Sequence, residues 1–234
     1  MLGGIAVSLI SKYLAGEEKL HGVAGIMESV ALAGGRLRYQ YIPAKAVASA
    51  ISIGSGASVG PEDPSVQIGA NIGSMLGQLL RMSDERIRTL VAAGVAAAIA
   101  TAFNAPIAGV FFAQELILEE LSRNALVMVL VTSVVSAIFT QAVSGPEPAF
   151  HVSAYAFNSG WELPLYLMLG LLAGLISALY VRLLYAMRDV FHHWHVPGGV
   201  KAAGVGLVIG IVGLFLPQTL GVGTPSAKFS IKTI

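Results

Sequence analysis

Two acidic residues stand next to each other in the stretch "GPEDP", where Glu62 and Asp63 are flanked by prolines. The sequence on both sides of this stretch is apolar and rich in small residues. Ionisable side chains inside the apolar segments of membrane proteins are rare, and they generally mark a path for ions or protons. The acidic pair is therefore the first place in this sequence at which chemistry is expected.

The residues after the pair predict a helix that begins beside it. "D-P-S-V" is a typical helix start, with Asp63 as the N-cap and Pro64 as the first helical residue. Glu62 precedes this cap, so capping does not explain it. Because the free N–H groups and the partial positive charge of a helix start attract anions, we expect the Glu62 carboxylate to lie there as a tethered substitute for a mobile anion.

The composition places these residues in a membrane protein. Of the 234 residues, 55% are hydrophobic and only 12% are charged, whereas a soluble domain carries about 25% charged residues. The formal net charge of +1 gives no reason to expect a nucleic-acid partner, and the lack of cysteine excludes disulfides and thiolate metal sites. "HHWH" at His192–His195 suggests a metal, but its position after a long apolar segment favours an interfacial belt. We expect an all-α integral membrane protein with no metal site and no cofactor.

The apolar segments that must position the acidic pair differ in length. The clearest are Ile87–Phe103, Ala105–Leu118, Ala125–Val143, Leu163–Met187 and Val200–Pro217, and a further one is Pro64–Leu80. About 20 residues are needed to cross the hydrocarbon core, so the uneven lengths predict tilted, partial or broken helices. Non-helical backbone is tolerated at membrane depth only inside protein or along a water-filled cavity. We therefore expect a buried site where "GPEDP" and "FNAPIAG" interrupt the helices.

Glycines repeat every four residues in three of the segments. They are Gly69, Gly73 and Gly77, then Gly170 and Gly174, and then Gly206 and Gly210. Small residues at this spacing let helix backbones approach each other closely in a membrane. The repeats predict close helix packing and indicate no further function.

Three stretches together resemble the CLC family of chloride channels and chloride/proton exchangers. They are "GSGASVGPEDPSVQIGANIG", "AAGVAAAIATAFNAPIAGVFFAQE" and, upstream, "HGVAGIMESVALAGGRLR", which is similar to the first pore motif of the family. The resemblance implies tilted and broken helices arranged in two inverted halves. On this basis residues 1–234 are a partial CLC-type transmembrane domain, with the first inverted repeat and the start of the second half. The N-terminal helices and the second-half pore motifs are expected to be absent from it.

The resemblance also implies roles for particular residues. The gating glutamate of the family corresponds to Glu62, and the anion-binding positions correspond to His21, Gly22, Gly60, Glu62 and Asp63. Chloride or a similar anion would be the transported ion. The chain would be a multi-pass protein of the cell membrane and a homodimer. The dimer contacts would come from Ala105–Leu118 and Ala125–Val143.

The sequence departs from the family pattern at the acidic pair. Asp63 stands where the family has a glycine, and Pro61 removes one backbone donor beside the gate. Two like charges about 4 Å apart repel by roughly 4 kcal/mol at an effective dielectric constant of 20. We therefore expect Asp63 to weaken anion binding. The first pore motif departs as well, with Leu20 in place of a glycine and Ala24 in place of a proline.

A second departure bears on proton coupling. In the exchangers of the family, a proton-transferring glutamate directly follows the glutamate that corresponds to Glu115, and this sequence has Leu116 there. Leucine carries no proton, which predicts a passive, voltage- or proton-gated anion channel. One alternative is a chloride/proton antiporter in which Glu119 supplies the proton path. Another is a truncated or degenerate fragment, since residues 1–234 alone are not expected to conduct.

An intramembrane enzyme has little support. The sequence holds no His-Glu-x-x-His motif and no plausible serine–base pairing. We therefore expect no catalytic residues.

Overall fold

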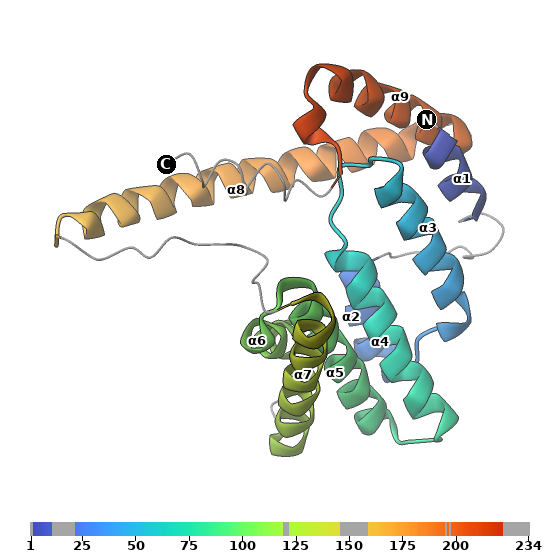
Figure 1. Cartoon of the computed structure of the whole chain (residues 1–234), viewed down its shortest axis with the longest axis vertical. Coiled ribbons are helices and arrows are strands. Elements are labelled where there is room, and N and C mark those ends of the chain that lie inside the picture. The colour runs from blue at the N-terminus through green and yellow to red at the C-terminus, as the bar shows by residue number, and fades with distance from the viewer. Residues whose placement is uncertain are drawn as a thin grey trace. The chain divides into compact units, whose positions relative to one another are not determined.

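The computed structural model describes residues 2–10, 22–118, 122–145, 159–194, 196 and 198–221. The regular structure in these ranges is helical, and no strand occurs among them. The α-helices are α1 (Leu2–Ile10), α2 (Gly22–Ala33), α3 (Ile42–Gly54), α4 (Glu62–Leu79), α5 (Asp84–Phe103), α6 (Pro106–Leu116), α7 (Arg123–Ser144), α8 (Glu162–His193) and α9 (Gly198–Phe215), as Figure 1 shows. Two short 3-10 helices are η2 (Tyr39–Tyr41) and η3 (Pro217–Thr219). The prediction of an all-α protein is confirmed.

The chain divides into two compact units. The first holds Met1–His151 and Ala202–Ile234, and therefore α1 to α7 and most of α9. The second is Val152–Lys201 and consists mainly of α8. The acidic pair and the first pore motif both belong to the first unit.

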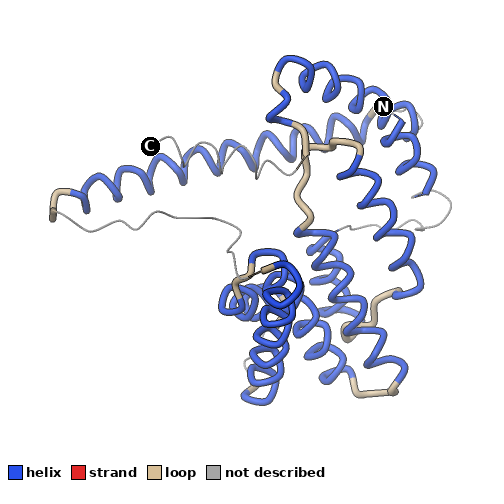
Figure 2. Tube along the Cα trace, in the orientation of Figure 1, coloured by secondary structure: helices blue, strands red, loops and turns tan. Residues whose placement is uncertain are grey.

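The core of the first unit lies where α4, α5, α6 and α7 pack against one another (Figure 1). The buried residues on α4 and α5 include Val66, Ile87, Val91 and Val95, each no more than 1% exposed. Short loops join α4 to α5 and α5 to α6, as Figure 2 shows between α4 and α5. The packed core next to which α4 begins is therefore built mainly from valine, isoleucine and alanine.

The glycine repeat of α4 lies on its contact with α5. A Cβ built at Gly73 would overlap the backbone carbonyl of Leu90, and Gly69 and Gly94 would overlap each other's carbonyls in the same way. The prediction of close packing is confirmed for α4, because its backbone lies in direct contact with the backbone of α5. For the repeats at Gly170 and Gly206 it stays a prediction.

The corner between α5 and α6 confirms that "FNAPIAG" interrupts the helices. Asn104 ends α5 in the left-handed conformation with φ 53°, and α6 begins at Pro106 two residues later. The buried Ser133 of α7 donates a hydrogen bond to the Pro106 carbonyl at 2.6 Å. This bond satisfies a carbonyl at the corner and attaches it to α7.

Within the described ranges, four helices are long and apolar enough to cross a membrane. They are α5, α7, α8 through residue 191, and α9, while α2 is a shorter apolar helix. Helix lengths run from 9 residues in α1 to 32 in α8. The predicted unevenness is confirmed, although several predicted ends differ from the observed ones by a few residues.

Candidate functional site

The acidic pair lies inside the first turn of α4. The helix begins at Glu62 with Pro61 as its N-cap, and no side chain caps it. The prediction that Asp63 caps a helix beginning at Pro64 is therefore wrong. Pro61 already has helical dihedral angles, φ −79° and ψ −4°. Pro64 is tolerated within the first turn because the N–H that proline lacks would have no partner inside the helix there.

The side chain of Glu62 folds back toward the loop before α4. It is partly buried, and a Cβ built at Gly60 would overlap its carboxylate. Glycine at position 60 is therefore what allows the carboxylate to lie over the backbone. The structure brings Gly60 and Glu62 together at a helix start, as the sequence predicts. An acidic side chain in a first turn also interacts favourably with the helix dipole.

Asp63 points to a different helix. Its Oδ1 accepts a hydrogen bond of 3.1 Å from the backbone N–H of Val23, and its Oδ2 accepts one of 2.7 Å from Gln67 Nε2. Val23 is the second residue of α2, so its N–H is one of the amides that a helix start leaves without an intrahelical partner. Asp63 therefore caps α2 and not its own helix, a role that sequence reasoning missed.

Gly22 makes room for this contact. It begins α2 with φ +75°, a conformation that favours glycine. A Cβ at this position would lie 2.8 Å from Asp63 Oδ1. The first pore motif and the acidic pair thus meet through Gly22 and Asp63. The other residue predicted in that motif, His21, lies outside the described residues.

The C-terminal end of α2 is attached to α4 by a hydrogen-bond network around the buried Ser74. The Ser74 hydroxyl donates to the Gly35 carbonyl at 2.7 Å and accepts from the Leu37 N–H at 2.8 Å. Gln78 Nε2 donates to Ser74 Oγ at 2.8 Å and to the Leu37 carbonyl at 2.9 Å. Ser74 is fully buried. Helix α2 is therefore tied to α4 at both ends.

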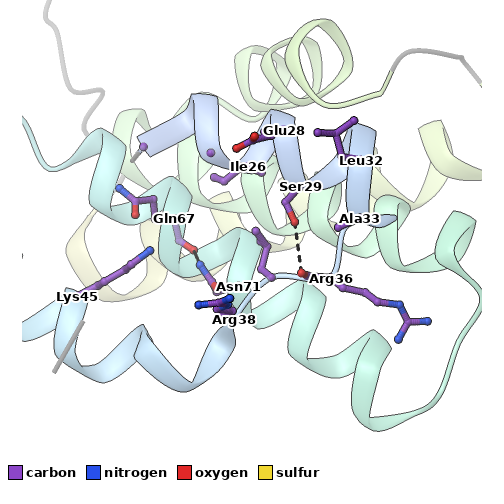
Figure 3. Close-up of a pocket in the computed structure, with 13 residues that line it drawn as sticks. Ile26, Glu28, Ser29, Leu32, Ala33, Arg36, Arg38, Lys45, Gln67 and Asn71 are labelled. Atoms are coloured by element: carbon purple, nitrogen blue, oxygen red, sulfur yellow. Dashed lines mark hydrogen bonds between the residues drawn. The ribbon is translucent and has the colours of Figure 1, made fainter. Parts of the chain in front are cut away.

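An open pocket with a volume of about 430 Å³ lies along α2 (Figure 3). Its lining includes Glu28 of α2, Arg38, Lys45 of α3, and Gln67 and Asn71 of α4. Figure 3 shows Gln67 and Asn71 on the same ribbon, with Lys45 beside them. Gln67 therefore both lines the pocket and holds the Asp63 carboxylate, so the pocket and the acidic pair share a residue.

The position predicted to matter for proton coupling lies at the end of α6. Glu115 is exposed, whereas Leu116 is partly buried and packs against the core. Leu116 is also the last residue of the helix. Its packing role agrees with an apolar side chain at that position. Glu119 lies outside the described residues.

Groups of three or more potential metal ligands are not found within the described ranges. For "HHWH", His195 and the side chain of His192 lie outside what the structure describes. The chemistry that the described site offers is consequently that of two carboxylates and the backbone amides of helix starts.

Fold and site together define an integral, multi-pass membrane protein in which the first turn of one helix presents acidic side chains beside the start of another. Residues 3–233 match the family model described as voltage gated chloride channel. The chain belongs to this family, the CLC family.

Individual relatives agree with this assignment. The chain is 34% identical over 225 residues to the ClcB-like chloride channel protein of Ralstonia nicotianae, covering 94% of this chain and 52% of that one. It is 34% identical to the H(+)/Cl(-) exchange transporter ClcA of Citrobacter koseri, covering 79% of this chain and 41% of the relative. A crystal structure of a slow cyanobacterial Cl-/H+ antiporter superposes with a TM-score of 0.81 at 28% identity, covering 95% of this chain and 53% of the other. The chain thus spans about half, or less, of these proteins.

Proposed function

We propose that this chain forms part of the anion pathway of a CLC membrane protein, with chloride or a similar anion as the transported ion and Glu62 as its gate. The observation that carries the proposal is the Glu62 carboxylate in the first turn of α4, folded over Gly60. The start of a helix attracts anions through its free amides. A mobile anion and the Glu62 carboxylate therefore compete for the same positive end.

Protonation of Glu62 is the step that opens the path in this proposal. A neutral carboxyl group has little attraction to the positive helix start, so it leaves that position to the mobile anion. Anion flux then rises as pH falls. The family description supports a role for voltage as well, and a charged gate within the membrane would respond to it.

Passive movement of the anion is the form of transport that we propose. The support is Leu116, an apolar side chain packed against the core where the exchangers of the family have a glutamate. Proton-coupled exchange is the second candidate, favoured by the likeness to the ClcA transporters and to the cyanobacterial antiporter. In that case another residue, Glu119 first, must carry the protons.

The assembly that we propose is a homodimer in the cell membrane, with contacts from Ala105–Leu118 and Ala125–Val143. Large apolar side chains are exposed on both segments, among them Ile107, Phe111, Val135 and Phe139. Lipid, a second copy or the regions found in the longer relatives would cover them. Because the relatives are about twice as long as this chain or longer, the proposed pore includes regions that they contain beyond the part matched here. No cofactor is proposed.

Chloride flux in liposomes tests the function. Residues 1–234 alone are not expected to conduct, so the test needs the chain together with the regions that its relatives contain beyond the matched part. For that protein we expect protein-dependent flux that rises as pH falls, and no flux at any pH would overturn the proposal. A pH-sensitive dye in the same liposomes separates the two candidates. If a chloride gradient drives protons uphill at a constant ratio, the protein exchanges the two ions and passive movement is wrong.

A further inference from the structure

We infer that Asp63 is a specificity-determining and positioning residue, which fixes the start of α2 against α4 with a carboxylate in place of a mobile anion. The inference rests on the proposed function. It separates two effects of one side chain: the contact that Asp63 makes to α2, and the negative charge that it brings beside Glu62.

Three residues from two helices converge on this carboxylate. Val23 donates its backbone N–H to one oxygen, and Gln67 donates its side-chain amide to the other. Gly22 has the positive φ and the missing Cβ that let the carboxylate approach. Because each oxygen has its own donor, the carboxylate is held in one orientation. An aspartate that only capped its own helix would not meet α2 at all.

The carboxylate also occupies an amide that an anion would otherwise use. The N–H of Val23 is one of the free donors at the start of α2. With the Asp63 carboxylate on it, that donor faces a fixed negative charge. Glu62 precedes Asp63 in the same turn, with its carboxylate over Gly60. An anion that approaches the Val23 amide therefore meets the Asp63 carboxylate directly and a second negative charge on the neighbouring residue. Asp63 therefore lowers anion affinity by occupation and by repulsion.

Asparagine at position 63 separates the contact from the charge. Its carbonyl oxygen accepts from Val23 as the carboxylate does, and its amide donates to Gln67 once the Gln67 amide is flipped. We expect Asp63→Asn to bind chloride about fivefold more tightly. A like charge about 4 Å from the anion costs about 1 kcal/mol in water, and this free energy corresponds to about fivefold in affinity. Asp63→Gly removes both charge and contact, so its gain in affinity should be smaller because the start of α2 is no longer fixed.

Two measurements on the intact protein in detergent test this. Calorimetric titration with chloride gives the affinities, and hydrogen–deuterium exchange of residues 22–33 reports whether α2 is fixed. Exchange should be unchanged in Asp63→Asn and faster in Asp63→Gly. If Asp63→Gly does not fold, the nearly isosteric Gln67→Met takes its place. It removes the 2.7 Å bond and should also speed exchange.

Asp84→Asn is the matched control. Asp84 is an exposed aspartate that holds Arg36, close to the other end of α2, at 2.9 Å. Its substitution removes a charge of the same kind and should leave chloride affinity unchanged. Equal chloride affinities in wild type and Asp63→Asn would overturn the inference while leaving the proposed function intact. Equal exchange in wild type, Asp63→Gly and Gln67→Met would overturn the positioning role. Failure of every variant, Glu62→Gln included, to bind chloride would overturn the proposed function and this inference with it.

Discussion

The two ends of α2 are attached to α4 in opposite ways. At the C-terminal end, the buried Ser74 and the Gln78 amide satisfy the backbone of the following loop through three hydrogen bonds, and a fourth joins the two side chains. At the N-terminal end, one exposed carboxylate, that of Asp63, accepts one backbone N–H. The C-terminal attachment centres on a fully buried hydroxyl, whereas the N-terminal one depends on an exposed carboxylate.

The two ends of α2 therefore differ in how much it costs to remove the partner of a backbone group. A buried donor that loses its partner stays unsatisfied, so the Ser74 network is costly to open. An exposed amide can exchange a carboxylate for water or for an ion at little cost. The start of α2 and the start of α4 are therefore the places where a partner can change while the rest of the fold stays fixed.

The largest effect is expected at the contact between α4 and α5, because α4 carries the side chains that hold both ends of α2. In Gly73→Ala the new methyl group would overlap the Leu90 carbonyl, which is helix backbone and cannot rotate away. We expect a loss of about 3 kcal/mol of stability or more, or failure to fold, since overpacking typically costs 1–3 kcal/mol even when side chains can adjust. Thermal unfolding in detergent measures it. Gly54→Ala is the control, because no described atom lies within 4 Å of a Cβ at Gly54.

Ser74→Ala removes the hydroxyl at the centre of the attachment of the C-terminal end of α2. It removes three hydrogen bonds and leaves the Leu37 N–H and the Gly35 carbonyl without this partner. Each unsatisfied buried group costs about 1–3 kcal/mol, so we expect a loss of about 2–3 kcal/mol by the same unfolding measurement. Ser65→Ala should cost less than about 1 kcal/mol, because the Ser65 hydroxyl only bonds Pro61 within its own turn. Similar losses of stability in Ser74→Ala and Ser65→Ala would mean that the Ser74 network contributes no more than a local bond within one helical turn.

Asp63→Ala tests how much the attachment at the N-terminal end of α2 contributes to stability. Loss of a helix cap typically costs about 1 kcal/mol, and Asp63 is exposed. We therefore expect a smaller change in unfolding temperature than in Ser74→Ala. If Asp63→Ala destabilised the protein as strongly as Ser74→Ala, the start of α2 would be as rigidly built as its end, and the comparison would fail.

The smallest effect is expected at the ion pair of Arg36 and Asp84. Their side chains are 51% and 58% exposed, and exposed pairs contribute about 0–1 kcal/mol. Arg36→Ala should lower stability by about 0.5 kcal/mol or less, and added salt should reduce the difference further. A loss above about 2 kcal/mol would mean that this pair, and not Ser74, holds the C-terminal end.

Much of the fold follows from the sequence pattern. Apolar run length locates α5 to α9, the glycine spacing predicts the face of α4 that meets α5, and the proline after Asn104 predicts the corner between α5 and α6. Helix α3 was not predicted, because Lys45 and two serines interrupt its apolar run. These are signals of local composition, and they fail where composition is mixed.

The interhelical cap could not be predicted in the same way. A capping motif is read within one segment, whereas Val23 lies 40 residues from Asp63. The spacing of four between Asp63 and Gln67 was a usable signal, because it places both side chains on one face of α4. Which amide they face depends on the packing of α2 against α4, which no local pattern contains.

Chloride flux as a function of pH, compared between wild type and Glu62→Gln, tests the central claim most directly. Both proteins must include the regions that the relatives contain beyond the part matched here. The neutral glutamine cannot hold the positive helix start against an anion, so flux in Glu62→Gln should be high and nearly independent of pH. Wild-type flux should rise as pH falls. Glu85→Gln, which changes an exposed acid in the first turn of α5, should follow the wild type. If Glu62→Gln kept the wild-type pH dependence, Glu62 would not be the gate.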